Sequence, residues 1–292
     1  MDRIYTEYAR AQSVYETEPD VESNEPFATK YAARAILADL VKVELETSIE
    51  ASLVYFIGKI DYETEDRVAA ETNFKRVRSL LEVIKDEEQN AMCFIKATNE
   101  LAIIWAERDE ASKSLEILNE AKELYVTIKS ENNKVPWDQW EVLKGENERN
   151  SRDERRSKFE EAHTSTLFIL AQATKAAGDE EQSALYCGEC LQRQLQGDSL
   201  INQREWSLHA ACLSQYYLTR DDYYTALACL RAASAIMAKV SQDEKRDESL
   251  ADMNRCWIKF LLGLLEHSKD ALVFINFERQ MGLQDGDGTK GK

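Results

Sequence analysis

Two cysteines separated by two residues, Cys187 and Cys190, have the spacing in this sequence best suited to chemistry. A C-x-x-C pair can act as a redox centre or supply half of the ligands of a structural zinc ion. A zinc site needs two further ligands, normally a second close pair, and the sequence has no such pair. A thioredoxin-like centre needs a βαβ setting, whereas the surrounding pattern is helical. We therefore expect both thiols to be buried, metal-free and part of the core.

The three histidines, His163, His209 and His267, show no catalytic or metal-binding spacing. None lies in an H-E-x-x-H motif, and His209 does not converge with Ser207 and Cys212 as a catalytic triad would. The glycine-rich phosphate loop and the dinucleotide fingerprint are also absent from the sequence. The 54 acidic residues make carboxylate pairs common, so no pair singles out a site. We predict a protein that is not an enzyme and uses no cofactor and no metal.

Helices must position any binding residues, because helix-forming residue types dominate the composition. The chain of 292 residues contains only 10 glycines and 3 prolines, too few for a fold rich in tight turns. Apolar periodicity predicts helices over about 2–18 and 28–43. The polar stretch between these two helices contains two prolines, which argues against one continuous helix.

The later helices form pairs, each with small residues, a short turn and large residues that cover the seam. Ile57, Leu101, Leu170 and Leu213 hold equivalent places and are spaced by 44, 69 and 43 residues. The tetratricopeptide period is about 34 residues, so these helices are longer than standard. We predict an all-α fold: a right-handed tetratricopeptide-like α-solenoid of antiparallel helix pairs.

The predicted organisation is a single helical-repeat domain over 1–281. The wide step between the second and third equivalent positions contains a charged insertion, which predicts a mobile loop at about 132–153. A polar segment precedes a last helix over 253–267. The tail at 282–292 is rich in Gly, Asp and Lys and is predicted to be disordered.

The formal net charge of −17 restricts the partners. An acidic surface repels nucleic-acid phosphates and anionic lipids but attracts a basic protein surface. No apolar run approaches the roughly 18 residues that span a bilayer, and the N-terminus lacks the apolar region of a signal peptide. We predict a cytoplasmic protein that binds another protein, with no binding to nucleic acid or membrane.

Several stretches carry a family resemblance, among them KYAARAIL at 30–37, NELAIIWAERDE at 99–110, LSQYY at 213–217 and RCWIK at 255–259. In order and approximate spacing they resemble the KIF-binding protein family, helical-repeat proteins that bind kinesin motor domains. The similarity runs from about residue 28 to 265 and the tail looks unrelated. The resemblance therefore covers the N-terminal part of the family, whose members carry further C-terminal helices.

The resemblance implies a regulator of microtubule-based transport that binds kinesin motor domains and blocks their attachment to microtubules. It also implies association with the cytoskeleton. A motor surface that recognises acidic tubulin must be basic, so an acidic solenoid can compete for it, whereas direct binding to microtubules is not expected. The alternative is a general tetratricopeptide scaffold or co-chaperone-like adaptor. Such adaptors clamp a terminal carboxylate with clustered cations, and here the inner positions carry only Lys96 and Lys175.

The partner-binding residues are expected on the inner side of the helix pairs. On tetratricopeptide geometry, the residue two positions after the large seam residue of each first helix faces the groove, which selects Gln172 and Gln215. The resemblance points to the same region, because Gln172 and Gln194 match polar positions associated with motor binding. Ile169 and Cys212 stand nearby where the family tends to have Tyr and Thr. We predict that these five residues contact the partner.

Overall fold

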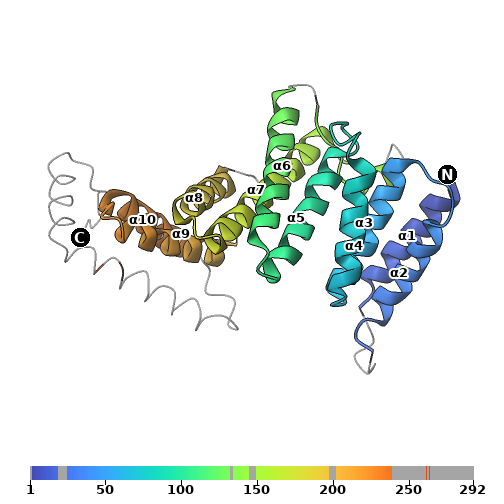
Figure 1. Ribbon diagram of the computed structural model, residues 1–292, viewed down its shortest axis with the longest axis horizontal. Coiled ribbons are helices and arrows are strands. Elements are labelled where there is room, and N and C mark those ends of the chain that lie inside the picture. Colours follow the sequence, from blue (N-terminus) through green and yellow to red (C-terminus); the bar gives the residue numbers. More distant parts are fainter. Residues whose placement is uncertain are drawn as a thin grey trace, which may run out of the picture. The chain divides into compact units, whose positions relative to one another are not determined.

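The computed structural model describes residues 2–18, 25–131, 134–144, 149–196 and 202–238, together with Leu261 and Gly263. Over these ranges it contains α-helices and one 3-10 helix and no strand, which confirms the predicted all-α class (Figure 1). The chain divides into two compact units, Met1–Tyr186 and Cys187–Lys292.

The elements follow one another in a simple order. The first unit contains α1 (Asp2–Glu16), α2 (Ala28–Leu40), α3 (Thr47–Glu63), α4 (Arg67–Leu81), α5 (Ala91–Glu107), α6 (Ala111–Ser130), η1 (Glu141–Leu143) and α7 (Arg152–Ala176). The unit boundary falls within α8 (Glu180–Gln196), and the second unit continues with α9 (Gln203–Leu218) and α10 (Tyr223–Met237). The first two helices end two to three residues earlier than the periodicity predicted.

Each predicted pair is joined by a tight turn with one residue in the left-handed backbone region. These residues are Glu65, Asp109, Gly178 and Asp221. Three of the four are followed by an aspartate that accepts a hydrogen bond from a backbone N–H in the first turn of the next helix. Asp66 accepts from Ala69, for example, and Asp222 accepts from Thr225. The left-handed residue reverses the chain, and the aspartate satisfies one of the N–H groups that a helix start leaves without a partner.

The seam between α3 and α4 shows why small residues were needed there. A Cβ placed on Gly58 would lie 2.9 Å from the ring of Phe74, so only glycine allows this approach. Ala70 and Val77 are fully buried in the same seam. The pattern of small and large residues thus predicted the packing of this pair correctly.

Residues 134–144, expected within a mobile loop, are packed into the first unit. Glu141 and Leu143 are only 1% and 2% exposed, and Trp140 packs against Phe56 with ring centroids 4.9 Å apart. Their aromatic and aliphatic side chains join the core formed with α1 and α3, so these residues are packed rather than solvent-exposed, while the mobility expected of the loop stays a prediction. The end of the expected loop is also helical, since α7 begins at Arg152 with a capping box formed by Ser151 and Glu154.

Other expectations fall on residues that the structure does not describe. The last helix predicted over 253–267 lies outside the described residues except for Leu261, which is helical and buried, and Gly263. The tail at 282–292 also lies outside them. The domain limits stay predictions.

Candidate protein-interaction surface

An exposed stripe of α7 carries the first predicted binding residue. Gln172 is exposed, and Ser165, Phe168 and Lys175 are also exposed at the three- and four-residue spacing that places side chains on one helix face. Phe168 is 38% exposed. An apolar ring flanked by neutral amide and hydroxyl groups suits recognition of another protein.

Ile169 does not lie on this stripe. Its side chain is 4% exposed, comparable to its buried neighbour Leu170. Helix α7 packs against both α5 and α6, so its buried face extends around the helix as far as Ile169. The predicted direct contact between Ile169 and a partner is therefore not supported, and we exclude this residue from the candidate surface.

The remaining predicted residues belong to the second unit. Cys212 and Gln215 are exposed on α9 at a spacing of three residues, while Leu213 and Ser214 between them are buried. Gln194 is half-buried near the end of α8. Gln172 belongs to the first unit, so these four residues are distributed over two units. Their contact with a partner stays a prediction.

Two other inner positions of the first unit already have partners within the chain. Lys96 on α5 donates hydrogen bonds to Asp138 at 3.1 Å and to the Gln139 side-chain oxygen at 2.6 Å. The Asn99 side chain is buried and donates to the backbone carbonyl of Ala162 on α7 at 3.2 Å. The sequence could not identify the partners of Lys96, because residues 134–144 were assigned to a loop.

Asp138 is the centre of this buried polar cluster. It is 4% exposed and accepts hydrogen bonds from Lys96 and, at 2.6 Å, from Lys158 on α7. Burial alone raises the pKa of Asp138, but the two ammonium groups outweigh this effect, and the pKa lies below its usual value. Asp138 is therefore a carboxylate in the folded protein at neutral pH.

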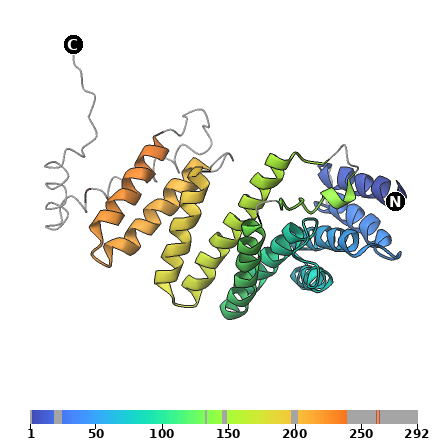
Figure 2. The same cartoon turned by 90° about the horizontal axis from the view of Figure 1, so that it is seen from above.

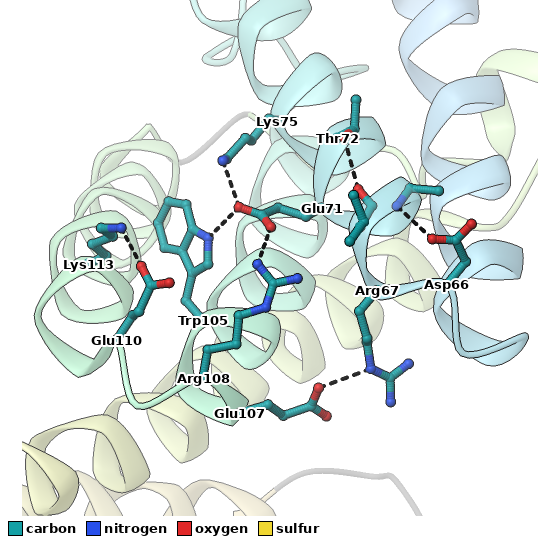
Figure 3. A network of polar contacts seen from close by, with 12 residues as sticks. Asp66, Arg67, Glu71, Thr72, Lys75, Trp105, Glu107, Arg108, Glu110 and Lys113 are labelled. Atoms are coloured by element: carbon teal, nitrogen blue, oxygen red, sulfur yellow. Dashed lines mark hydrogen bonds and ion pairs between the residues drawn. The ribbon is translucent and has the colours of Figure 1, made fainter.

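A second polar network joins α4 to α5 at the surface (Figure 3). Glu71 accepts hydrogen bonds from Lys75 at 2.6 Å, from the indole nitrogen of Trp105 at 3.0 Å and from Arg108. The bonds from Lys75 and Trp105 are the main reason that the pKa of Glu71 falls to about 2. Glu107 pairs with Arg67 beside it. These contacts give Trp105, Glu107 and Arg108, all within the resemblance stretch at 99–110, a role in joining neighbouring helices.

The cysteine pair differs in part from expectation. Cys190 is 3% exposed, and burial raises its pKa to about 11. Cys187 is only half-buried, so the expected burial holds for Cys190 alone. No group of three or more His, Cys, Asp or Glu within the described ranges could hold a metal ion.

His163 is buried, with its ring stacked on Tyr125 at a centroid distance of 3.6 Å.

No helix in the described part of the chain is long and apolar enough to cross a membrane. What this part does present is paired helices, turns with one left-handed residue and seams covered by large side chains. These features define a tetratricopeptide-like helical-repeat protein. A crystal structure of nearly identical TPR-like repeats from Podosopora anserina has a TM-score of 0.50 at 13% identity, covering 82% of this chain and 98% of that one.

The sequence is similar to KIF-binding proteins over most of its length. That of Gallus gallus is 34% identical over 303 residues, which cover 94% of this chain and 50% of the relative. A solved structure of Kinesin binding protein (KBP) has a TM-score of 0.65 at 24% identity, covering 94% of this chain and 55% of that one. The chain spans about half the length of the curated relatives it matches.

A family profile described as "KIF-1 binding protein C terminal" matches residues 204–290. Together with the similarity to the full-length relatives, this match confirms the resemblance to the KIF-binding protein family. The profile also continues past residue 265. The tail up to residue 290, which looked unrelated to the family in the sequence, therefore matches it as well.

Proposed function

We propose that this chain binds kinesin motor domains and keeps them from attaching to microtubules. The observation that carries the proposal is the 34% identity to a KIF-binding protein along 94% of the chain. Through its motors the protein would associate with the cytoskeleton in the cytoplasm and regulate transport along microtubules. It would act as a binding protein, without catalysis.

The charge of the chain supports this proposal physically. A kinesin motor approaches acidic tubulin with a basic surface, and a chain with a net charge of −17 attracts that surface. Long-range attraction of this kind accelerates encounter, whereas close neutral contacts determine how long the complex lasts. The exposed stripe of Phe168 and Gln172 on α7, and that of Cys212 and Gln215 on α9, supply such neutral groups.

The test is a pull-down with isolated kinesin motor domains, followed by co-sedimentation of the bound motor with microtubules. We expect the chain to retain at least one motor domain and to leave that motor in the supernatant when microtubules are pelleted. Lysozyme, a basic protein unrelated to kinesin, serves as the control for unspecific attraction to the acidic chain. Failure to retain any motor above the lysozyme level would refute the proposal.

No observation favours a carboxylate-clamping adaptor. Lys96, one of the two inner lysines available for such a clamp, is already engaged by Asp138 and Gln139. Peptides that end in a free carboxylate can be included in the same pull-down and are expected not to bind.

A further inference from the structure

Residues 134–144 lie across the first helices of the pairs in the first unit; we refer to them as the plug. After α6 the chain runs back toward α1 and α3 before α7 begins (Figure 2). The plug makes two backbone-anchored contacts with the turn between α4 and α5. The N–H of Val135 donates to the Glu88 carboxylate at 2.8 Å, and that of Trp137 donates to the Glu88 carbonyl at 2.7 Å.

The aromatic part of the plug packs against three aromatic rings of α1 and α3. The ring of Trp140 lies 6.3 Å from that of Tyr8 on α1, and 5.6 and 4.9 Å from those of Tyr55 and Phe56 on α3. All three receiving side chains are at most 4% exposed. Aromatic pairs at such distances stabilise the contact beyond the apolar area that they bury.

The charged part of the plug meets three cations that the helices supply. Asp138 accepts from Lys96 on α5 and Lys158 on α7, and Glu141 forms an ion pair of 2.8 Å with Arg155 on α7. The side chain of Glu141 is 1% exposed and that of Asp138 is 5% exposed. Lys96, Lys158 and Arg155 therefore each pair with a carboxylate of the plug, although the chain as a whole is strongly acidic.

The plug therefore resembles a bound peptide more than a part of the repeat framework. It is short, it does not pair with a following helix as the repeat helices do, and its side chains contact residues of α1, α3, α5 and α7. In tetratricopeptide-like repeats the first helices of the pairs form the inner face, where extended peptides bind through pockets for particular side chains.

We propose that this face of the first unit is a peptide-binding site that the chain occupies with its own residues 134–144. The class of external ligand that it accepts is an extended peptide with two tryptophans and two carboxylates, spaced as Trp137, Asp138, Trp140 and Glu141 are. Because both ends of the plug are tethered, its effective concentration is of millimolar order, so it excludes a free peptide of equal affinity. A partner reaches the site only when the plug opens.

The test uses the full chain with residues 134–144 replaced by a Gly/Ser segment of equal length. A fluorescent peptide of the plug sequence should bind this variant and raise its melting temperature, while binding the parent at least tenfold more weakly. A control peptide with W137A and W140A should bind neither protein. A folded variant that does not bind the plug peptide, or a parent that binds it as tightly as the variant does, would overturn the proposal.

A second measurement covers the case in which the variant does not fold. Hydrogen exchange of the parent reports how the N–H groups of Val135 and Trp137 open. We expect them to exchange through a local opening, at least tenfold faster than the slowest amides of α3 and α5. Exchange at the same rate as those amides would mean that the plug leaves only on global unfolding, and the proposal would be wrong. Neither result depends on binding to kinesin.

Discussion

Lys158 on α7 donates a 2.6 Å hydrogen bond to Asp138, which lies twenty residues earlier in the chain, just before η1. This contact holds the start of α7 against the segment that packs on α1 and α3. Asp138 lies within the charged insertion at about 132–153, and Lys158 follows it on α7. The bond therefore gives a polar connection a structural role at the edge of the core, since Asp138 is buried and Lys158 is partly exposed.

Replacing this carboxylate tests its role. D138N removes a buried negative charge while Lys96 and Lys158 stay in place, so we expect the free energy of unfolding to fall by about 2 kcal/mol. This figure is below the usual cost for a fully buried pair, because the side chains of Lys96 and Lys158 are 26% and 40% exposed. Urea unfolding followed by circular dichroism measures the change. D153N is the matched control, since the side chain of Asp153 is 95% exposed, and should change stability little.

The Glu71 network predicts part of the acid sensitivity of the chain. The pKa of Glu71 is lowered to about 2, mainly by its hydrogen bonds from Lys75 and Trp105. A carboxylate with a depressed pKa stabilises the fold above its unfolded pKa of about 4.3, and this contribution is lost as the pH falls toward 2.

We therefore expect E71Q to flatten the stability curve between about pH 5 and pH 2 and to lower stability at pH 7 by no more than about 1 kcal/mol, because the network lies at the surface. Thermal unfolding at a series of pH values measures both effects. E116Q, at an exposed position of α6, is the control. An unchanged pH profile in E71Q would show that the network contributes nothing to stability.

The cysteines should differ strongly in their reactivity toward a thiol reagent. Burial raises the pKa of Cys93 to about 12 and that of Cys190 to about 11, so neither is a thiolate at pH 8, whereas Cys212 is exposed. We expect Cys212 to be labelled at least tenfold faster than Cys93 and Cys190 in the native protein, as measured by mass spectrometry of each peptide. Denaturation should make the rates equal.

The same preparation tests the expectation that Cys187 and Cys190 bind no metal. Elemental analysis of the purified protein should find less than one zinc per ten chains. Stoichiometric zinc that is lost in C190S would show that the pair is part of a metal site.

The polar residues of the candidate surface should control how long a motor stays bound. We expect Q172A combined with Q194A to leave association with a kinesin motor domain unchanged and to speed dissociation about fivefold, which corresponds to about 1 kcal/mol. Raising the salt concentration should slow association equally for the parent and the double variant.

Surface plasmon resonance with an immobilised motor domain separates the two rates. N119A, an exposed amide on α6, is the control and should leave both rates unchanged. A double variant that dissociates at the parent rate would place the interface elsewhere on the chain.

Much of the helical framework could be predicted from the sequence, since a helix pair depends on local information. The spacing of apolar residues determines which face of a helix is buried, and Gly58 with Phe74 shows how small and large residues match across a seam. The side chains of Gln172 and Gln215 are exposed as their places in the repeat predicted. These features require only periodicity and turn chemistry within about 40 residues of chain.

Tertiary structure alone decided which polar residues are buried. In the sequence, Asp138 and Glu141 were assigned to a charged loop, and the cations on α5 and α7 help to make their burial favourable. Ile169 stood one turn from an exposed glutamine, but two neighbouring helices widen the buried face of α7 to include it. In each case the burial of the residue depends on side chains of another helix. The sequence gives the type of each residue, but it does not show which charges or apolar surfaces will contact that residue in the folded chain.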